Sequence, residues 1–192
     1  MYLLVGLGNC KAEYENTRHN FGFLLIDKII ARYKFIPQGK KFKSNFFLGE
    51  IEGIKIVALK PQTFMNNSGL AVAEAIKFYK IPLQNIIVFH DDLDLAFTKI
   101  KYKIGGGNGG HNGLKSLDEN IGKEYARIRL GIGRPEHLKY EISDYVLSKF
   151  NKEELENIDK ISDKISENFG YLLNNKSQNF LNKIHLSGPQ FA

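Results

Sequence analysis

The stretch NIIVFHDDLD, residues 85–94, places four consecutive apolar residues and one histidine before a cluster of acidic residues. An apolar run without polar alternation is typical of a parallel strand that is buried on both faces. Asn85–Phe89 is therefore expected to be an interior strand, with the acidic cluster at its carboxyl end. In open α/β sheets, ligands bind in the crevice outside the carboxyl ends of the strands.

Helical and extended patterns alternate along the chain on both sides of this strand. Further strands are expected at Tyr2–Val5, Asn45–Glu52, Ile54–Lys60, Lys99–Ile104 and Ala126–Ile132. Apolar residues at helical spacing predict one helix that begins at Phe21, with Asn20 as a possible N-cap. Other helices are expected at Gly69–Tyr79, Leu114–Asn120, Glu153–Leu173 and Ser177–Ile184. The alternation predicts an α/β fold with a mixed sheet, and residues 1–192 contain no repeat or linker that would divide them into more than one domain.

Composition narrows the class of protein. Hydrophobic residues make up 43% of the chain and charged residues 25%, which are values of a globular protein. The formal charge of +6 favours a polyanionic partner, although basic proteins without such a partner are common. The single cysteine, Cys10, excludes an internal disulfide framework and fits a reducing cytoplasm. No apolar run is long enough to cross a membrane, and the N-terminal stretch MYLLVGLGN fits a first strand better than a signal peptide.

Polar side chains cluster where the expected strands and loops end. Asn9 follows the first strand, His19 precedes the first helix, Asp91 follows the interior strand, and Asn66 and Asn112 lie in loops. Each of them could instead cap a helix, stabilise a turn or carry a solvated charge. Topology nevertheless allows all five to converge on one cleft, where they would supply a base, a carboxylate and neutral hydrogen-bonding groups.

Several common site motifs do not fit. Gly6-Leu-Gly8 begins a dinucleotide fingerprint, but Lys11 occupies the third glycine position. Gly105 and Gly110 have the spacing of a phosphate-binding loop, but His111-Asn112 stands where Lys-Ser/Thr is needed. The histidines lack the close spacing of zinc ligands, so no metal site is expected. The chain also has no GxSxG motif, so a serine nucleophile of that type is not expected. Water activated by a histidine is left as the nucleophile.

Six blocks of sequence, in order and with matching spacing, make the chain resemble the bacterial-type peptidyl-tRNA hydrolases. They are VGLGN (5–9), EYENTRHNFG (13–22), PQTFMNNSG (61–69), HDDLDL (90–95), GGHNGLKS (109–116) and RIRLGIGRP (127–135). The resemblance implies a monomeric cytoplasmic α/β enzyme with a twisted mixed sheet. It would hydrolyse the ester between peptide and tRNA without a cofactor, and so recycle tRNA from peptidyl-tRNAs that ribosomes release prematurely. Cys10-Lys11 departs from the family's usual Pro-Gly, and Asn108 stands where relatives can have His.

The resemblance also implies roles for individual residues. His19 would be the general base and Asp91 its partner, with Asp92 as the nearest rival to Asp91. Asn9 would distinguish peptidyl-tRNA from aminoacyl-tRNA by sensing the amide that replaces a free α-amino group.

The remaining implied roles concern the substrate. Lys103 and Arg129 would clamp the 5′-phosphate of the tRNA. His111 would be a substrate contact or a loop anchor, and Met65 would line the peptide path or simply pack. The other implied substrate contacts are Tyr14, Phe64, Asn66 and Asn112. The glycines of 105–113 would let backbone approach the ester and let the loop move.

Two other functions fit parts of the pattern. Relatives of this fold in organelles serve as RNA-splicing partners without a required hydrolase role, and a general esterase would share the histidine chemistry. The basic balance of the chain, together with Lys103 and Arg129, favours an RNA-linked ester over a general one.

Overall fold

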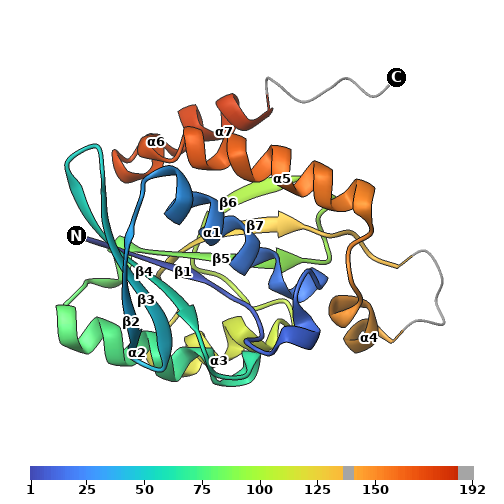
Figure 1. The fold of residues 1–192 in the computed structure, drawn as a ribbon, viewed down its shortest axis with the longest axis horizontal. Coiled ribbons are helices and arrows are strands. Elements are labelled where there is room, and N and C mark those ends of the chain that lie inside the picture. The colour runs from blue at the N-terminus through green and yellow to red at the C-terminus, as the bar shows by residue number, and fades with distance from the viewer. Residues whose placement is uncertain (136–140, 186–192) are drawn as a thin grey trace.

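One seven-stranded sheet, in the order β2-β3-β4-β1-β5-β7-β6, forms the centre of the protein (Figure 1). It is seen in a computed structural model that describes residues 1–135 and 141–185. The strands are Tyr2–Gly6 (β1), Ile36–Lys41 (β2), Ser44–Ile51 (β3), Ile54–Pro61 (β4), Ile86–Asp92 (β5), Ile100–Ile104 (β6) and Ala126–Gly131 (β7).

The sheet is mixed, as the sequence predicts. β1 pairs in parallel with β4 and β5, and β5 pairs in parallel with β7. Antiparallel pairing adds β3 and β2 beyond β4, and β6 beyond β7. The expected interior strand is confirmed: β5 lies between β1 and β7, and its residues from Ile86 to Asp91 are all buried. The arrows of β5 and β7 point toward the end of the molecule where α4 lies (Figure 1).

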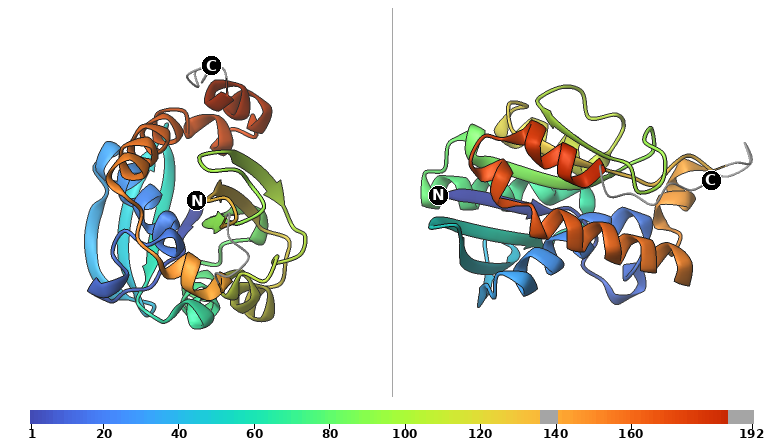
Figure 2. Two further views of the ribbon diagram at one scale, coloured as in Figure 1. Left: turned by 90° about the vertical axis from the view of Figure 1, so that its right-hand side faces the viewer. Right: turned by 90° about the horizontal axis from the view of Figure 1, so that it is seen from above.

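Helices cover both faces of the sheet (Figures 1 and 2). They are Phe21–Arg32 (α1), Ser68–Tyr79 (α2), Asn112–Ile121 (α3), Ile142–Leu147 (α4), Lys152–Glu167 (α5), Gly170–Leu173 (α6) and Ser177–His185 (α7). α1 and α5–α7 share one hydrophobic core with the sheet, while α2 and α3 share the other. None of the helices in residues 1–135 and 141–185 has the length and apolar character needed to span a membrane.

Close backbone approach at Gly22 brings α1 onto the carboxyl ends of β1 and β5. A Cβ atom at this position would lie 2.4 Å from the carbonyl oxygen of Phe89 and 2.6 Å from the backbone nitrogen of Leu7. A side chain cannot be accommodated at these distances, so glycine is required here. The contact fixes the start of α1, and with it the short 3₁₀ helix Arg18–Asn20 (η2) that precedes it.

One expectation about the elements is wrong, and two elements were not expected at all. The single helix expected at Glu153–Leu173 is two helices, because the chain turns at Asn168 and Phe169, whose ring packs edge-on against Phe89. β2 was not expected because all its residues are exposed and show no apolar alternation. α4 was not expected because it has only six residues, none of them buried.

Asn20 directly precedes α1, but its side chain makes no capping hydrogen bond. It binds the backbone of Asn9 instead, with Asn9 N–H donating to Asn20 Oδ1 at 2.7 Å and Asn20 Nδ2 donating to Asn9 O at 3.0 Å.

Candidate active site

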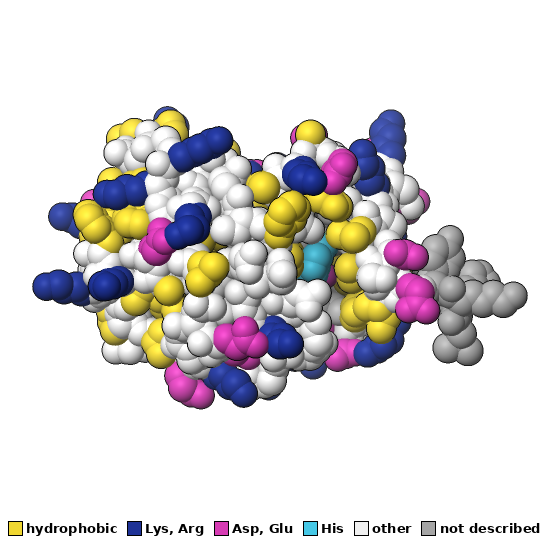
Figure 3. Space-filling view, turned by 90° about the horizontal axis from the view of Figure 1, so that it is seen from below, with side chains coloured by type: hydrophobic (Ala, Val, Ile, Leu, Met, Phe, Trp, Pro, Cys, Tyr) yellow, Lys and Arg dark blue, Asp and Glu magenta, His cyan; other side chains and the backbone are white. Residues whose placement is uncertain are grey.

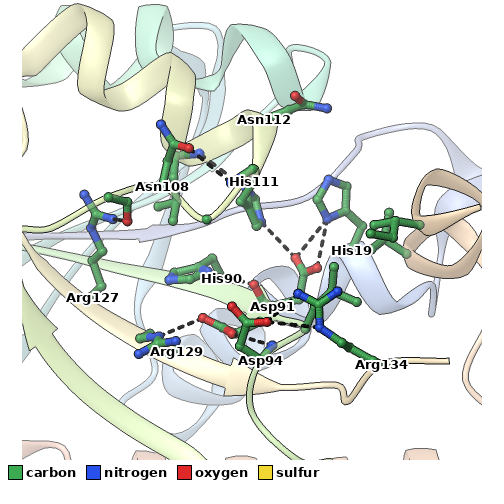
Figure 4. Close-up of a pocket in the computed structure, with 18 of the residues that line it drawn as sticks. His19, His90, Asp91, Asp94, Asn108, His111, Asn112, Arg127, Arg129 and Arg134 are labelled. Atoms are coloured by element: carbon green, nitrogen blue, oxygen red, sulfur yellow. Dashed lines mark hydrogen bonds and ion pairs between the residues drawn. The ribbon is translucent and has the colours of Figure 1, made fainter. Parts of the chain in front are cut away.

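His19 and Asp91 form a buried hydrogen-bonded pair at the carboxyl end of β5 (Figure 4). His19 lies on η2 and its Nδ1 is 2.9 Å and 3.0 Å from the two carboxylate oxygens of Asp91. Since an ionised carboxylate only accepts hydrogen bonds, Nδ1 carries the proton. Nε2, on the far side of the ring, is then the basic nitrogen of the neutral imidazole.

Burial and charge act in opposite directions on this pair. Burial by itself raises the pKa of the Asp91 carboxyl, but its interactions with His19 and His111 outweigh burial and hold that pKa well below the usual range. Burial by itself lowers the pKa of His19, but the charge and hydrogen bond of Asp91 outweigh it, so the pKa of His19 is raised above 6.5. The geometry therefore maintains an ionised carboxylate whose charge stabilises a protonated His19.

His111 contributes a second imidazole to Asp91 (Figure 4). Its Nε2 lies 3.0 Å from Asp91 Oδ1, and its ring centroid is 4.7 Å from that of His19. The other ring nitrogen, Nδ1, accepts the backbone N–H groups of Gly113 and Leu114 at 3.1 Å and 3.3 Å, so His111 is the N-cap of α3. Both ring nitrogens of His111 are thus engaged by other groups of the protein.

The ligand-capable atoms of His19, Asp91 and His111 lie within 4.8 Å of one another, which raises the question of a metal ion. A histidine that binds a metal ordinarily donates its other ring N–H to an acceptor. Nδ1 of His111 instead accepts two N–H groups and carries no proton. Metal binding through Nε2 would require a fully deprotonated imidazole, so this arrangement suits a hydrogen-bonded triad and opposes a metal centre.

The neighbouring acidic residues are paired with arginines and not with His19. Asp92 Oδ2 accepts a hydrogen bond from Arg129 Nε at 2.7 Å, and Asp94 pairs with Arg134 at 2.6 Å. The structure therefore joins Asp91, and not its rival Asp92, to the imidazole. The hydrogen bond and charge of Arg129 lower the pKa of Asp92 despite the opposing effect of burial.

A cavity of about 380 Å³ opens beside His19 and Asp91. Lys103 and Arg129 line it, as do Asn112 and the glycine loop from Gly107 to Gly110, and α4 contributes Ile142, Ser143 and Val146. Figure 3 shows a histidine in a hollow bordered by hydrophobic side chains on one face of the molecule. The cavity thus combines a base, neutral amides and cations within an apolar rim.

Comparison with known proteins identifies the family. The sequence profile described as peptidyl-tRNA hydrolase matches residues 3–190. The peptidyl-tRNA hydrolase of Azorhizobium caulinodans is 47% identical, with 97% of this chain and 91% of the relative aligned. That of Rickettsia conorii is 48% identical over 96% of this chain and all of the relative. The chain belongs to the peptidyl-tRNA hydrolase family. The crystal structure of the peptidyl-tRNA hydrolase from Acinetobacter baumannii superimposes with a TM-score of 0.89 at 37% identity, covering 96% of this chain and 94% of that one.

Within this family fold, Asn9 lies beside the cavity and does not line it. Its Oδ1 accepts the backbone N–H of Met65 at 3.0 Å, so the amide NH₂ remains as a donor. Asn9 borders a second, smaller cavity of about 240 Å³ together with Cys10 and Lys11. Met65 is buried, and its sulfur lies where a Cβ on Gly113 would approach to 2.6 Å, so this side chain packs between Asn9 and α3.

The other sequence-predicted residues lie outside the lining of the larger cavity. Tyr14 is half-buried on the 3₁₀ helix Ala12–Tyr14, and Asn66 is exposed on the 3₁₀ helix Met65–Asn67. Phe64 is 52% exposed, and the ammonium of Lys11 lies 5.2 Å from its ring centroid. Lys11 thus places a cation beside this exposed aromatic ring.

Sequence reasoning missed the side chains that support the site. Arg18 precedes His19, and its guanidinium lies 4.8 Å from the ring centroids of both Tyr145 and Phe150. It also pairs with Glu154 at 2.8 Å, which ties the His19 segment to α4 and α5. The sequence signal at Glu154 is a capping box with Asn151, which marks the start of α5 and gives no indication of the pairing with Arg18.

Arg127 is a second missed support. It is 2% exposed, and its guanidinium donates to the carbonyl oxygens of Gly106 and Gly107 at 3.1 Å and 2.9 Å. It also pairs with Asp118 at 3.0 Å. The alternating RIR pattern predicts that residues 127 and 129 lie on the same face of a strand. It does not show that the guanidinium of Arg127 is used in hydrogen bonds within the protein.

His90 is the third missed residue. Its Nδ1–H donates to the carbonyl oxygen of Asp91 at 2.8 Å, and its ring packs edge-on against His111. Burial lowers the pKa of His90 to about 3, so this imidazole stays neutral and serves as a wall of the cavity.

Proposed function

We propose that the chain hydrolyses the ester bond between the peptide (or an N-blocked amino acid) and the tRNA of peptidyl-tRNA, with His19 activating a water molecule. The family membership supports the substrate and the esterase activity. The observation that carries the mechanism is the His19–Asp91 pair. Asp91 binds Nδ1 of His19, which leaves Nε2 as the basic nitrogen of a side chain that lines the larger cavity.

His19 Nε2 takes a proton from water as the water oxygen attacks the ester carbonyl carbon. Asp91 stabilises the resulting imidazolium through the Nδ1–H bond and holds the tautomer, as an orienting carboxylate does in hydrolytic triads. The tetrahedral intermediate collapses, the bond between the carbonyl carbon and the ribose oxygen breaks, and the imidazolium gives its proton to that departing oxygen, which leaves as the ribose hydroxyl. A positioned base of this kind typically contributes about 10²–10⁴-fold in rate.

The amides around the reacting ester would supply neutral hydrogen bonds. Asn112, at the first residue of α3 and in the lining of the cavity, is placed to position the water or donate to the oxyanion. Such a donor can contribute about 2.7–4 kcal/mol. Asn66 and Met65 would contact the substrate beside Asn9, whose free NH₂ would recognise the peptide amide. Tyr14 and Phe64 would lie beside the tRNA end.

Lys103 and Arg129 would bind the 5′-phosphate of the tRNA. Both line the cavity that holds His19, and they lie on neighbouring antiparallel strands, where Lys103 of β6 is paired with Arg127 and Arg129 of β7 with Lys101. Among the described residues, no carboxylate forms an ion pair with Lys103, while Arg129 uses its Nε for Asp92. The alkyl chain of Lys103 passes over Gly106, where a Cβ atom would lie only 2.7 Å from Cε of the lysine. Glycine at position 106 therefore leaves room for the Lys103 side chain.

We further infer a monomeric enzyme that acts in the cytoplasm, where ribosomes release the substrate, and that requires no cofactor. This rests on the family and on a base and carboxylate that complete the proton transfer by themselves. Sedimentation of the purified protein would test the monomer.

The deciding experiment is release of N-acetyl-amino acid from N-acetyl-aminoacyl-tRNA by purified protein. Unblocked aminoacyl-tRNA is the matched control, and a small activated ester tests general esterase activity. We expect fast release from the blocked substrate alone. Binding of tRNA without turnover would support the RNA-splicing partner function instead, and equal turnover of the small ester would support a general esterase.

A further inference from the structure

The two nitrogens of His111 connect different parts of the protein. Nδ1 accepts two backbone N–H groups at the start of α3, and Nε2 faces the Asp91 carboxylate at the end of β5. An imidazole nitrogen accepts hydrogen bonds only when it carries no proton, so Nδ1 is unprotonated and Nε2–H is the donor. The N-terminus of α3 therefore selects the tautomer of His111.

We propose that His111 is a positioning residue, a neutral imidazole whose Nε2–H holds the Asp91 carboxylate in place for His19. The proposal rests on the proposed function for its consequence in catalysis, while its structural part concerns the protein alone. It differs from a role in substrate contact, because both polar atoms of the ring are already used within the protein.

Asp91 depends on such a donor because water cannot replace it. Its side chain is 2% exposed, and a buried carboxylate that lacks donors carries a large desolvation cost. Oδ1 accepts from both imidazoles, at 2.9 Å from His19 and 3.0 Å from His111. Two donors from separate elements fix the rotation of the carboxylate, and with it the orientation of the His19 ring.

The second donor also limits how strongly Asp91 retains a proton on His19. A hydrogen bond to a carboxylate stabilises its negative charge and weakens the pull of that charge on other protons. Without the His111 donor, the charge of Asp91 would act on His19 alone. His19 would then remain protonated to higher pH and be less available as a base near neutrality.

Other groups near His19 do not replace this donor. The cations of the cavity are committed elsewhere or lie apart from Asp91: Arg129 pairs with Asp92, Arg134 with Asp94, and Lys103 lies across Gly106. On η2, Arg18 pairs with Glu154. The cavity-lining residues of α4 are Ile142, Ser143 and Val146, none of which titrates near neutral pH, and His90 donates to a carbonyl oxygen.

Two substitutions distinguish the role of Nε2 of His111, which faces Asp91, from that of Nδ1, which caps α3. His111→Asn keeps an oxygen near the position of Nδ1, and asparagine is a preferred N-cap, but its side chain is too short to reach Asp91. His111→Gln places an amide NH₂ near the position of Nε2 and gives up the cap. The asparagine variant therefore removes the Asp91 donor, and the glutamine variant is the matched control that retains it.

The test is the NMR titration of the His19 ring in wild type and both variants, with kcat and KM for N-acetyl-aminoacyl-tRNA measured across the same pH range. We expect the His19 midpoint to rise by about one pH unit in His111→Asn, the effect of losing a hydrogen bond to a charged group, and kcat near neutrality to fall about tenfold. In His111→Gln the midpoint should stay close to the wild-type value.

An unchanged His19 midpoint in the folded asparagine variant overturns the proposal, as does an equal rise in both variants. A higher KM in both variants with an unchanged midpoint shows that His111 contacts the substrate. The titration needs no turnover, so a wild-type protein that fails to hydrolyse the substrate counts against the proposed function and not against the role of His111.

Discussion

Asp91→Asn should impair the base more than the loss of one charge suggests, because the amide cannot match both hydrogen bonds to His19. Nδ1 of His19 is 2.9 Å from Oδ1 and 3.0 Å from Oδ2. In the variant, one of these positions becomes an NH₂ donor that faces the Nδ1–H donor. The conflict is relieved when His19 takes the other tautomer, whose Nε2 carries the proton and cannot act as the base.

The expected magnitude follows from the bond that is lost. A hydrogen bond to a charged group is worth about 1.5–3 kcal/mol, so its loss from the transition state lowers kcat by roughly 10- to 150-fold. The unfavourable tautomer increases the loss further.

The pH dependence has a definite sign. Asp91 raises the pKa of His19 above 6.5, so the acid limb of kcat/KM in the wild type should lie above that pH. Removing the carboxylate leaves burial as the dominant effect, and burial lowers the pKa of His19. The limb should therefore move to lower pH in Asp91→Asn while the plateau falls.

The assay is steady-state hydrolysis of N-acetyl-aminoacyl-tRNA between pH 5 and 9, with Asp92→Asn as the matched control. Asp92 pairs with Arg129 and has no contact with His19, so its substitution should change KM and leave kcat and the acid limb in place. The reasoning fails if Asp91→Asn keeps a wild-type kcat, or if Asp92→Asn is the variant that moves the limb.

Three further predictions concern the proposed roles. His19→Ala should lower kcat by about 10²–10⁴-fold while tRNA binding, measured by filter retention, stays intact; near-normal turnover would exclude His19 as the base. Asn9→Asp keeps the buried acceptor for the Met65 N–H but removes the free NH₂, so the ratio of kcat/KM for blocked and unblocked substrates should fall; an unchanged ratio would reject the sensing role. Lys103→Ala combined with Arg129→Ala should raise KM, abolish most of the preference for 5′-phosphorylated over dephosphorylated tRNA, and reduce the salt slope of binding by about 0.7–0.9 for the lost phosphate contact. An undiminished preference in this double variant would show that the two cations do not bind the phosphate.

Some features of the fold could be predicted because they depend on local pattern. The run Ile86–Phe89 is apolar without alternation, and the structure buries it between two parallel neighbours. Gly53, at a φ of +79° between β3 and β4, matches the break expected between two strands. β2 carries no such pattern, since an edge strand pairs through its backbone and can leave every side chain in water.

The candidate site also contains residues that could be predicted from the sequence and contacts that could not. His19, Asp91 and Asn112 could be named from the ends of the expected strands and helices, and Lys103 and Arg129 were named by the family resemblance; all five line one cavity. Apart from the His19–Asp91 pair, which the resemblance implied, the partners of these side chains could not be named. Asn20 was expected to cap a helix, yet its amide binds Asn9, because tertiary packing placed two backbone groups of Asn9 within its reach.

By itself, the sequence determined the alternation of elements, the mixed sheet, the family resemblance and the chemical types of groups available at the strand ends. The resemblance paired His19 with Asp91, and the structure places them 2.9 Å apart. Only the tertiary structure showed that the Arg127 guanidinium binds carbonyl oxygens of the glycine loop and that His111 joins Asp91 to α3. The physical reason is that adjacent residues of a strand point to opposite sides, while hydrogen bonds form over about 3 Å between groups that are distant in sequence. Spacing along the chain can indicate a face, but the protonation state and orientation of a buried side chain depend on what the fold brings against it.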